Sequence, residues 1–288
     1  MKYLQILRIS NWIKNLFIFI PLFFSSELLN SQKIFPTIFA LIGFSFVSSF
    51  VYIINDIFDI EFDKKHPLKK YRPIASGNVS IVNSLLIGFP LLLAGLFIIH
   101  RISVESFILT LIYILLNLLY SLILKNVPII DFIIISIGFV LRIYIGGYIG
   151  EIILSQWIII LVFLISLFIA ITKRRDDVFQ FQNKNKINRK VVTKYNLEFM
   201  DKSITIITAV LIVTYILFIS SGEVINRYQS DYLFFTVLPV LIGLLRYNQI
   251  TYVYNKSGSP IDTLFKDRFL QITLMSWILM FYFILYSK

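Results

Sequence analysis

The sequence contains no cysteine. This absence excludes a disulfide framework, a thiolate zinc site and a cysteine nucleophile. The long apolar runs also lack the polar–apolar alternation that is typical of a transmembrane β-barrel. The chain is instead rich in apolar residues, because 58% of its 288 residues are hydrophobic and its mean hydropathy is +0.82. A soluble domain is nearer one half apolar. We therefore expect lipid, rather than water, to surround most of the chain.

Nine apolar stretches are each about the 20 residues long that a membrane-spanning helix needs. Backbone groups in lipid must bond within their own segment, so these stretches predict helices. The prediction is an all-α, multi-pass membrane bundle of about nine transmembrane helices, forming a single domain over residues 1–288. The stretches are 10–29, 36–57, 81–99, 104–124, 128–149, 153–172, 203–221, 231–250 and 269–287.

The first stretch superficially resembles a secretory signal, because a basic start precedes an apolar run between Met1 and Phe24. No small-residue cleavage site follows. We therefore expect this segment to be retained as the first helix.

The net charge of +11 would suggest nucleic acid binding in a soluble protein. Here most basic residues lie in short loops, where they indicate topology instead, and no nucleic acid partner is expected. If the N-terminus is cytoplasmic, the outer segments hold only Lys33, Arg101, Arg227 and Lys288. This asymmetry predicts that the N-terminus is cytoplasmic, in a multi-pass protein of the inner (plasma) membrane. It also places the two most polar loops, 58–80 and 173–202, together on the cytoplasmic side.

The second apolar stretch ends in a cluster of acidic residues. Asp56, Asp59 and Asp63 are spaced i, i+3 and i+7, and Asn55 lies four residues before Asp59. On a helix these side chains project from one face. Three crowded carboxylates repel one another unless a cation neutralises them. Mg²⁺ binds a few carboxylate oxygens and completes its shell with water and substrate phosphates, so the cluster predicts a metal–diphosphate site.

A basic run follows at once, from Lys64 to Arg72. These cations could bind outer phosphate oxygens. The alternative is a solvated cytoplasmic loop that carries only a topology signal. The sequence leaves both interpretations open.

The spacing of Asn55, Asp56, Asp59 and Asp63 resembles the first aspartate-rich motif of the UbiA superfamily of intramembrane transferases. The segments Arg8–Asn15, Asp63–Pro67, Arg72–Gly77 and Gly138–Arg142 are similar to its decaprenyl-phosphate phosphoribosyltransferase branch. Further segments that fit this branch are Leu154–Trp157, Gly243–Tyr247 and Asp267–Arg268. The resemblance covers nearly the whole chain.

One departure separates this chain from ordinary UbiA prenyltransferases. Those enzymes carry a second motif, Asp-x-x-x-Asp, where this chain has Thr172-Lys-Arg-Arg-Asp-Asp177. Neighbouring helix residues point about 100° apart, so Asp176 and Asp177 cannot both aim at one metal. The phosphoribosyl branch likewise has Lys-Arg here, and a cationic motif suits two anionic substrates. The alternative is a topology signal at the end of the sixth helix.

The resemblance implies transfer of 5-phosphoribose from phosphoribosyl diphosphate to a polyprenyl phosphate, with release of diphosphate. It also implies a role in cell wall biosynthesis, although the pathway cannot be read from the sequence. A metal held by Asp56, Asp59 and Asp63 would neutralise the leaving group. Carboxylates alone do not distinguish Mg²⁺ from Mn²⁺. Asp56, Asp59, Lys173 and Arg174 are the implied catalytic residues. The expected substrate-binding residues are Lys14, Asn55, His66, Lys70, Arg72, Arg142 and Asp177.

Two other functions stay open at this point. A conventional UbiA prenyltransferase would use the same first motif to ionise a prenyl diphosphate. A transporter or lipid carrier would be expected to place its polar residues near the membrane midplane, whereas here they gather at the cytoplasmic rim. Arg142 is an exception, because it lies deep in the fifth stretch, where an ionisable residue should face a cavity and a partner. The oligomeric state is not predicted.

Overall fold

The computed structural model describes residues 2–65, 69–184 and 190–286. The chain divides into two compact units, Met1–Leu154 and Ser155–Lys288. Each unit is considered by itself. That residues 1–288 act as one functional domain stays a prediction.

The all-α prediction is confirmed, since every regular element of the described residues is a helix. In the part of the chain that the structure describes, eight helical segments are long and apolar enough to cross a membrane, so the chain is a multi-pass membrane protein. The first predicted stretch is the exception, because it forms the shorter apolar segment Ile9–Phe24. The predicted count of about nine is therefore close. The cytoplasmic placement of the N-terminus stays a prediction.

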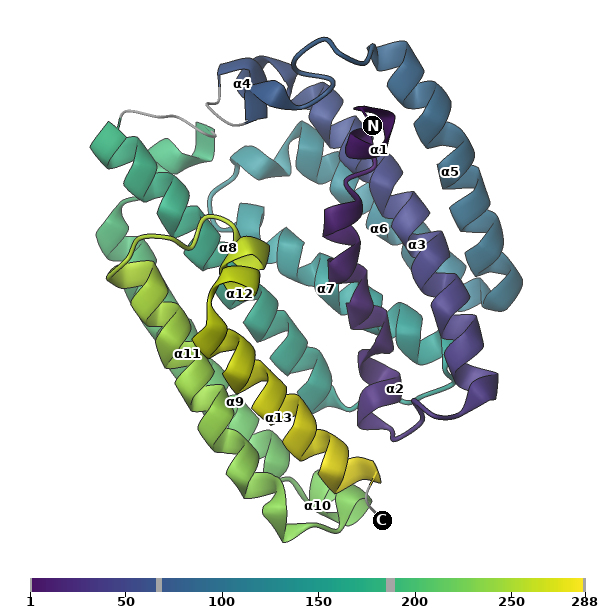
Figure 1. The fold of residues 1–288 in the computed structure, drawn as a ribbon, viewed down its shortest axis with the longest axis vertical. Coiled ribbons are helices and arrows are strands. Elements are labelled where there is room, and N and C mark those ends of the chain that lie inside the picture. Colours follow the sequence, from purple (N-terminus) through teal and green to yellow (C-terminus); the bar gives the residue numbers. More distant parts are fainter. Residues whose placement is uncertain (1, 66–68, 185–189, 287–288) are drawn as a thin grey trace. The chain divides into compact units, whose positions relative to one another are not determined.

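Among its described residues, the N-terminal unit has seven α-helices, which Figure 1 labels, and three 3₁₀ elements. In chain order they are α1 (Lys2–Ile6), η1 (Ile9–Phe19), α2 (Ile20–Phe24), α3 (Ser31–Phe58), α4 (Ile60–Lys65), η2 (Lys69–Tyr71), α5 (Ile81–Ile102), α6 (Val104–Leu122), η3 (Leu124–Asn126) and α7 (Ile130–Ile149).

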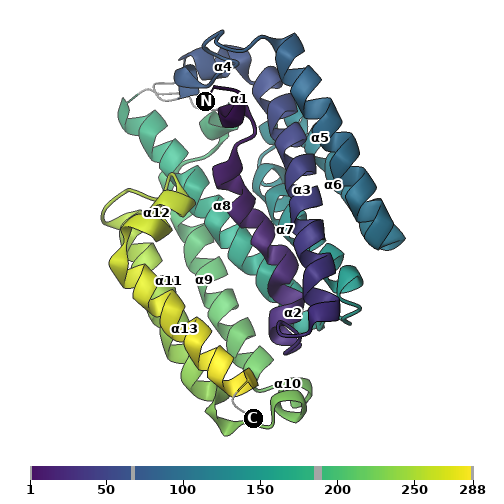
Figure 2. The same ribbon diagram turned by 45° about the vertical axis from the view of Figure 1, so that its right-hand side comes forward.

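Helix α3 is the central element of this unit and packs along α5 (Figure 2). It begins five residues before the predicted stretch, because the Asn30 side chain caps it by accepting a hydrogen bond from the backbone N–H of Gln32. The two helices approach closely where Gly43 faces Gly95. A Cβ atom added to Gly95 would lie 2.4 Å from the Gly43 carbonyl oxygen, so glycine is needed for this contact.

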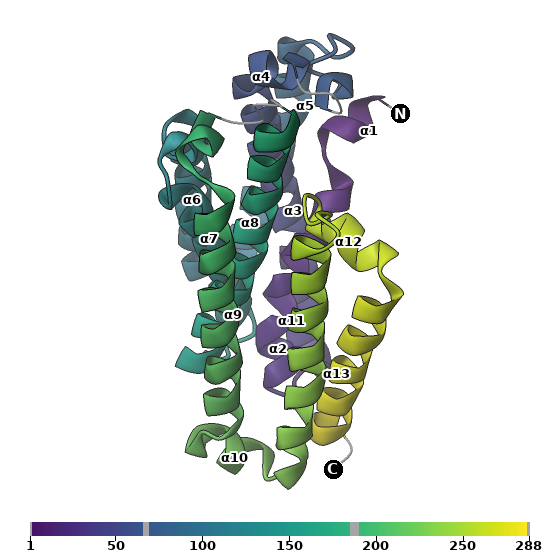
Figure 3. The same cartoon turned by 90° about the vertical axis from the view of Figure 1, so that its left-hand side faces the viewer.

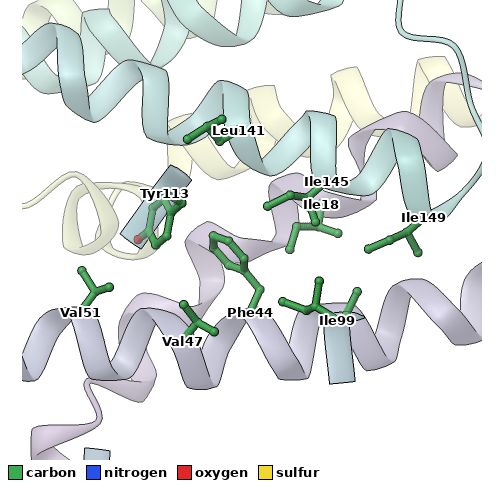
Figure 4. Close-up of a cluster of buried hydrophobic side chains, with 10 residues drawn as sticks. Ile18, Phe44, Val47, Val51, Ile99, Tyr113, Leu141, Ile145 and Ile149 are labelled. Carbon is green, nitrogen blue, oxygen red and sulfur yellow. The ribbon is translucent and has the colours of Figure 1, made fainter. Parts of the chain in front are cut away.

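The 3₁₀ element η1 packs against both α3 and α7. A Cβ atom on Gly146 would lie 2.0 Å from the Ile18 carbonyl oxygen, so the two backbones are in direct contact. Figure 4 shows the hydrophobic cluster beside this contact, in which Ile18, Phe44 and Ile145 point toward one another. Burial of this cluster fixes η1 on the unit and so sets the positions of its polar side chains.

The C-terminal unit contains α8 (Gln156–Lys184), η4 (Lys190–Lys194), α9 (Leu197–Ile219), α10 (Gly222–Tyr228), η5 (Asp231–Thr236), α11 (Val237–Tyr252), α12 (Pro260–Lys266) and α13 (Arg268–Tyr286). Figure 3 shows α11 and α13 side by side in this unit. Helix α8 continues through residues 173–184, which the sequence had indicated as the start of a loop. The second motif is therefore helical.

Candidate functional site

The first acidic motif lies where α3 passes into α4. Asp59 caps the end of α3, and its backbone N–H donates to the Asn55 carbonyl oxygen at 3.0 Å. The backbone N–H of Asp63, in α4, donates in turn to the Asp59 carbonyl oxygen at 2.8 Å. The i to i+4 backbone hydrogen bonds therefore continue from α3 into α4, although the two helices are separated at Asp59. This local geometry agrees with the helical spacing on which the site was predicted.

Two arginines, Arg8 and Arg72, neutralise Asp56 and Asp63. Asp56 is 5% exposed and Asp63 3% exposed. The Arg72 Nη1 atom donates to Asp56 Oδ1 at 3.0 Å and to Asp63 Oδ2 at 2.5 Å. Arg8 binds Asp56 with two nitrogens, Nε at 3.1 Å and a closer Nη2. Burial lowers the pKa of the Arg8 guanidinium from its ordinary value, and the Asp56 carboxylate acts in the opposite direction.

Asp59 has a different set of partners. Lys125 Nζ donates to its Oδ1 at 2.6 Å, and Asn55 Nδ2 donates to its Oδ2 at 3.1 Å. The Ser121 hydroxyl donates to Asn55 Oδ1 at 3.2 Å, which orients the amide. Asn55 and Asp59 thus bond toward the end of α6 and η3, whereas Asp56 and Asp63 share Arg72.

The donor set of this motif is chemically suited to a divalent cation, since it consists of carboxylate and amide oxygens. In the described residues, however, no group of three His, Cys, Asp or Glu side chains is arranged to hold one ion. Arg8, Arg72 and Lys125 bond the oxygens that a metal would use. The residues fit a metal in type, and binding it would require these cations to exchange partners.

Lys14 and Lys70, which were predicted to bind substrate phosphates, lie in different parts of the N-terminal unit. Lys14 Nζ is 6.0 Å from the centre of the Tyr52 ring, one turn of α3 before Asp56. Lys70 is exposed and lies 5.0 Å from the ring centre of its neighbour Tyr71. His66 lies outside the described residues.

Arg142 is 4% exposed and is surrounded by neutral groups. It donates to Asn15 Oδ1 at 3.0 Å, to the Gly138 carbonyl oxygen at 2.6 Å and to the Tyr113 hydroxyl at 3.1 Å. Its guanidinium carbon also lies 5.0 Å from the centre of the Phe44 ring. The sequence predicted a partner for this arginine, and the structure identifies neutral acceptors and aromatic faces.

The second motif belongs to the C-terminal unit, on α8. Arg174 Nη1 donates to Asp177 Oδ2 at 2.7 Å, and Gln180 donates to Asp176 Oδ2 at 2.7 Å. The two neighbouring aspartates therefore have different partners, as their helical spacing indicates. Lys173 is exposed whereas Arg174 is buried.

Arg175 holds this motif in place. Its Nε donates to Asp201 Oδ1 at 2.9 Å, and its Nη1 donates to the Thr251 carbonyl oxygen at 2.9 Å and also to Asn255. These bonds connect α8 with α9 and with the end of α11. Sequence reasoning assigned no separate role to Arg175, and its place directly after an apolar run was a signal that could have identified it.

Sequence reasoning also missed Arg8 and Lys125 as partners of the acidic motif. Neither residue was among the predicted site residues. The need to neutralise three clustered carboxylates was a signal that further cations must lie nearby. Which cations these are depends on contacts across 48 and 66 residues, which spacing cannot reveal.

The model of the UbiA prenyltransferase family matches residues 17–285. The chain belongs to this family. It is therefore an intramembrane transferase. It is 28% identical over 282 residues to a decaprenyl-phosphate phosphoribosyltransferase of Corynebacterium glutamicum, covering 96% of this chain and 84% of that protein. The protein of the same name from Mycolicibacterium smegmatis is 30% identical over 245 residues, covering 83% and 77%.

The UbiA fold is also found in a solved structure of a UbiA homolog from Archaeoglobus fulgidus, bound to GPP and Mg²⁺. That structure matches with a TM-score of 0.74 over 99% of both chains. The identity is 19%, so this likeness concerns the fold alone.

Proposed function

We propose that this chain transfers 5-phosphoribose from phosphoribosyl diphosphate to a polyprenyl phosphate. The observation that carries the proposal is the cationic second motif, whose carboxylates Asp176 and Asp177 bond Gln180 and Arg174. A conventional prenyltransferase would need an Asp-x-x-x-Asp pair there to hold a second metal, whereas the two aspartates of this chain are adjacent. The names of the two bacterial relatives, which match over most of their length, support the same reaction.

In the proposed reaction, the bond between ribose C1 and the diphosphate oxygen breaks, and diphosphate leaves with the electron pair. A new bond forms between C1 and an oxygen of the lipid phosphate. This phosphate is already anionic at neutral pH, so no strong general base is required. The task of the protein is to bind, orient and neutralise phosphate groups.

Asp56, Asp59 and Asp63, with Asn55, would hold a divalent cation, Mg²⁺ or Mn²⁺, which when bound stabilises charge on the leaving diphosphate. Arg72 and Lys70 bind outer phosphate oxygens, and His66 is a further predicted contact. Lys14 and Arg142 also belong to the substrate-binding set. On the second motif, Lys173 and Arg174 orient phosphates, and Asp177 sets the position of Arg174 through their ion pair.

We place this site on the cytoplasmic side of the inner (plasma) membrane. The asymmetry of Lys and Arg between the loops supports this placement. The water-soluble donor is then met at the membrane surface, while the polyprenyl tail of the acceptor stays in the apolar phase.

The test uses full-length protein in lipid nanodiscs with Mg²⁺, labelled phosphoribosyl diphosphate and a polyprenyl phosphate. We expect a lipid-linked ribose phosphate to form together with diphosphate. The Asp59→Asn variant serves as the inactive control. If no lipid-linked product forms while a prenyl diphosphate is consumed with an aromatic acceptor, the proposal is wrong and the chain is a conventional prenyltransferase.

A further inference from the structure

Basic side chains lie at three levels along α3, beside Phe44, Tyr52 and Asp56. Eight and four residues separate these positions, so each is rotated from the one before it, by about 80° and then about 40° around the helix. Arg142 lies on the Phe44 ring, Lys14 lies 6.0 Å from the centre of the Tyr52 ring, and Arg8 bonds Asp56. The guanidinium carbon of Arg8 also lies 5.4 Å from the centre of the Tyr52 ring, so Lys14 and Arg8 share this ring, and of the two only Arg8 bonds a carboxylate.

The charge of Arg142 is buried without an acid. Each of its three nitrogens donates to a neutral acceptor, and none of the ion pairs found in the described residues includes it. Its bonds to Asn15, Gly138 and Tyr113 satisfy the N–H donors of the guanidinium group, but they do not compensate its positive charge. A buried charge of this kind is costly within a membrane unless another charge compensates it.

Lys14 lies between this buried arginine and the acidic motif. Asn15, the next residue, is 1% exposed, accepts from Arg142 and donates to Ser45 and Ser48. This anchoring fixes the backbone beside Lys14. The positive charges of both Arg142 and Arg8 act on the Lys14 ammonium. In the part of the chain that the structure describes, Lys14 contacts the Tyr52 ring and forms no bond to a carboxylate.

From this geometry we propose that Lys14 binds the phosphate of the lipid acceptor, with Arg142 as a positioning residue behind it. This inference rests on the proposed function. It assigns the diphosphate of the donor and the phosphate of the lipid acceptor to two different depths along α3. The diphosphate of the donor belongs at Asp56, Asp59 and Asp63. The lipid phosphate belongs one turn of α3 deeper, about 6 Å along the helix axis.

Charge and depth favour the acceptor over the donor at Lys14. The carboxylates of the acidic motif are already paired with Arg8, Arg72 and Lys125, so that level has no unpaired positive charge to offer a phosphate, whereas the Lys14 level carries an excess of positive charge. A lipid phosphate also arrives with its tail in the apolar phase, on the membrane side of the acidic motif. An ammonium that is half-buried and near two guanidinium groups offers a dianionic phosphate both attraction and compensation for its lost hydration.

The experiment measures binding of farnesyl phosphate to the full-length protein in nanodiscs by calorimetry, without metal or donor. Lys14→Met should weaken this binding at least tenfold, and Lys14→Arg should restore most of it. Binding of diphosphate with Mg²⁺ to Lys14→Met should change less than twofold. Lys33→Met is the matched control, since Lys33 pairs with Glu27 elsewhere in the unit and should leave both affinities unchanged.

A second variant tests the part assigned to Arg142 without removing it. Asn15→Asp places a carboxylate against Arg142 at almost constant volume, so farnesyl phosphate should bind several-fold more weakly although Lys14 is intact. Farnesol and inorganic phosphate separate the contributions of tail and headgroup. Both should bind more weakly than farnesyl phosphate. Inorganic phosphate binding as tightly as farnesyl phosphate would overturn the lipid assignment.

The proposal fails if Lys14→Met binds farnesyl phosphate like the wild type, or loses Mg²⁺-dependent diphosphate binding to the same extent. These outcomes are distinct from failure of the proposed function. If the wild type makes no lipid-linked ribose phosphate but binds farnesyl phosphate through Lys14, the subsite stands and the donor assignment falls. If product forms with an unchanged KM for the lipid in Lys14→Met, the subsite falls and the reaction stands.

Discussion

The Nη1 atom of Arg72 lies 2.5 Å from Oδ2 of Asp63, and the same nitrogen also donates to Asp56. Both carboxylates are buried, so Arg72 is an internal counter-ion of the acidic motif. Removing one partner from a buried ion pair typically costs about 3 kcal/mol or more of stability, because the remaining charge is left uncompensated.

Arg72→Met should therefore lower the thermal unfolding midpoint of the protein in EDTA. Mg²⁺ should recover part of the loss, since a cation bound by Asp56 and Asp63 supplies the missing charge. Differential scanning calorimetry in detergent, with and without Mg²⁺, measures both effects. An equal Mg²⁺ increment in the wild type and the variant would contradict the assignment of these carboxylates to a metal.

Asp59→Ala should abolish turnover, with a loss of about two orders of magnitude or more, while the protein stays folded. Asp59 contributes one of the proposed metal oxygens, and its carboxylate is paired with Lys125 near the surface of the unit. The matched control is Glu61→Gln, which alters an exposed carboxylate in the same segment and should keep activity. Retained turnover in Asp59→Ala, measured as formation of lipid-linked product, would count against the metal site.

Gly258→Ala should destabilise the second motif. An added Cβ atom would lie 2.3 Å from Asp176 Oδ2, and this buried carboxylate is already held by Gln180. Overpacking of this kind costs about 1–3 kcal/mol. Gly222→Ala is the control, because its added Cβ atom would meet open space, with no atom of a more distant residue within 4 Å. Equal unfolding midpoints for the two variants would show that the loop beside Asp176 can shift freely.

The ion pair between Arg246 and Asp267 should make stability depend on pH. The hydrogen bond from Arg246 holds the pKa of Asp267 below its ordinary value. A depressed pKa adds stability that is present above the unfolded value, near 3.9, and is lost as pH falls through the folded pKa. Asp267→Asn should thus be less stable than the wild type at pH 7, with a difference that shrinks below pH 4. Urea unfolding of both proteins across this range checks the sign.

The helices and the acidic motif followed from local properties of the chain. Hydropathy placed the eight long spans, and the spacing from Asn55 to Asp63 placed four polar side chains within successive turns of helix. The true start of α3 depends on the Asn30 cap, which hydropathy does not register. The continuation of α8 past residue 172 depends on tertiary partners of Arg175, so composition alone indicated a loop.

The cations around the motif could not be assigned from the sequence, because each comes from a distant segment. Arg8 reaches Asp56 across 48 residues, and Lys125 reaches Asp59 across 66. The same is true of Arg142, whose acceptor Asn15 is 127 residues away. Sequence reasoning correctly marked Arg142 as exceptional within a span, and only the fold identifies what surrounds it.

The 3₁₀ conformation of Ile9–Phe19 makes this segment sensitive to the insertion of residues. With three residues per turn, Trp12, Asn15 and Ile18 stand in one row, where they meet Ser49, Ser45 and the backbone at Gly146. These three contacts also fix the position of Lys14, which lies in the adjacent row of the 3₁₀ element. Inserting one alanine after Trp12 would rotate everything on one side of it by about 120° relative to the other. A single added residue in this segment should therefore be more harmful than several added to the loop after α9.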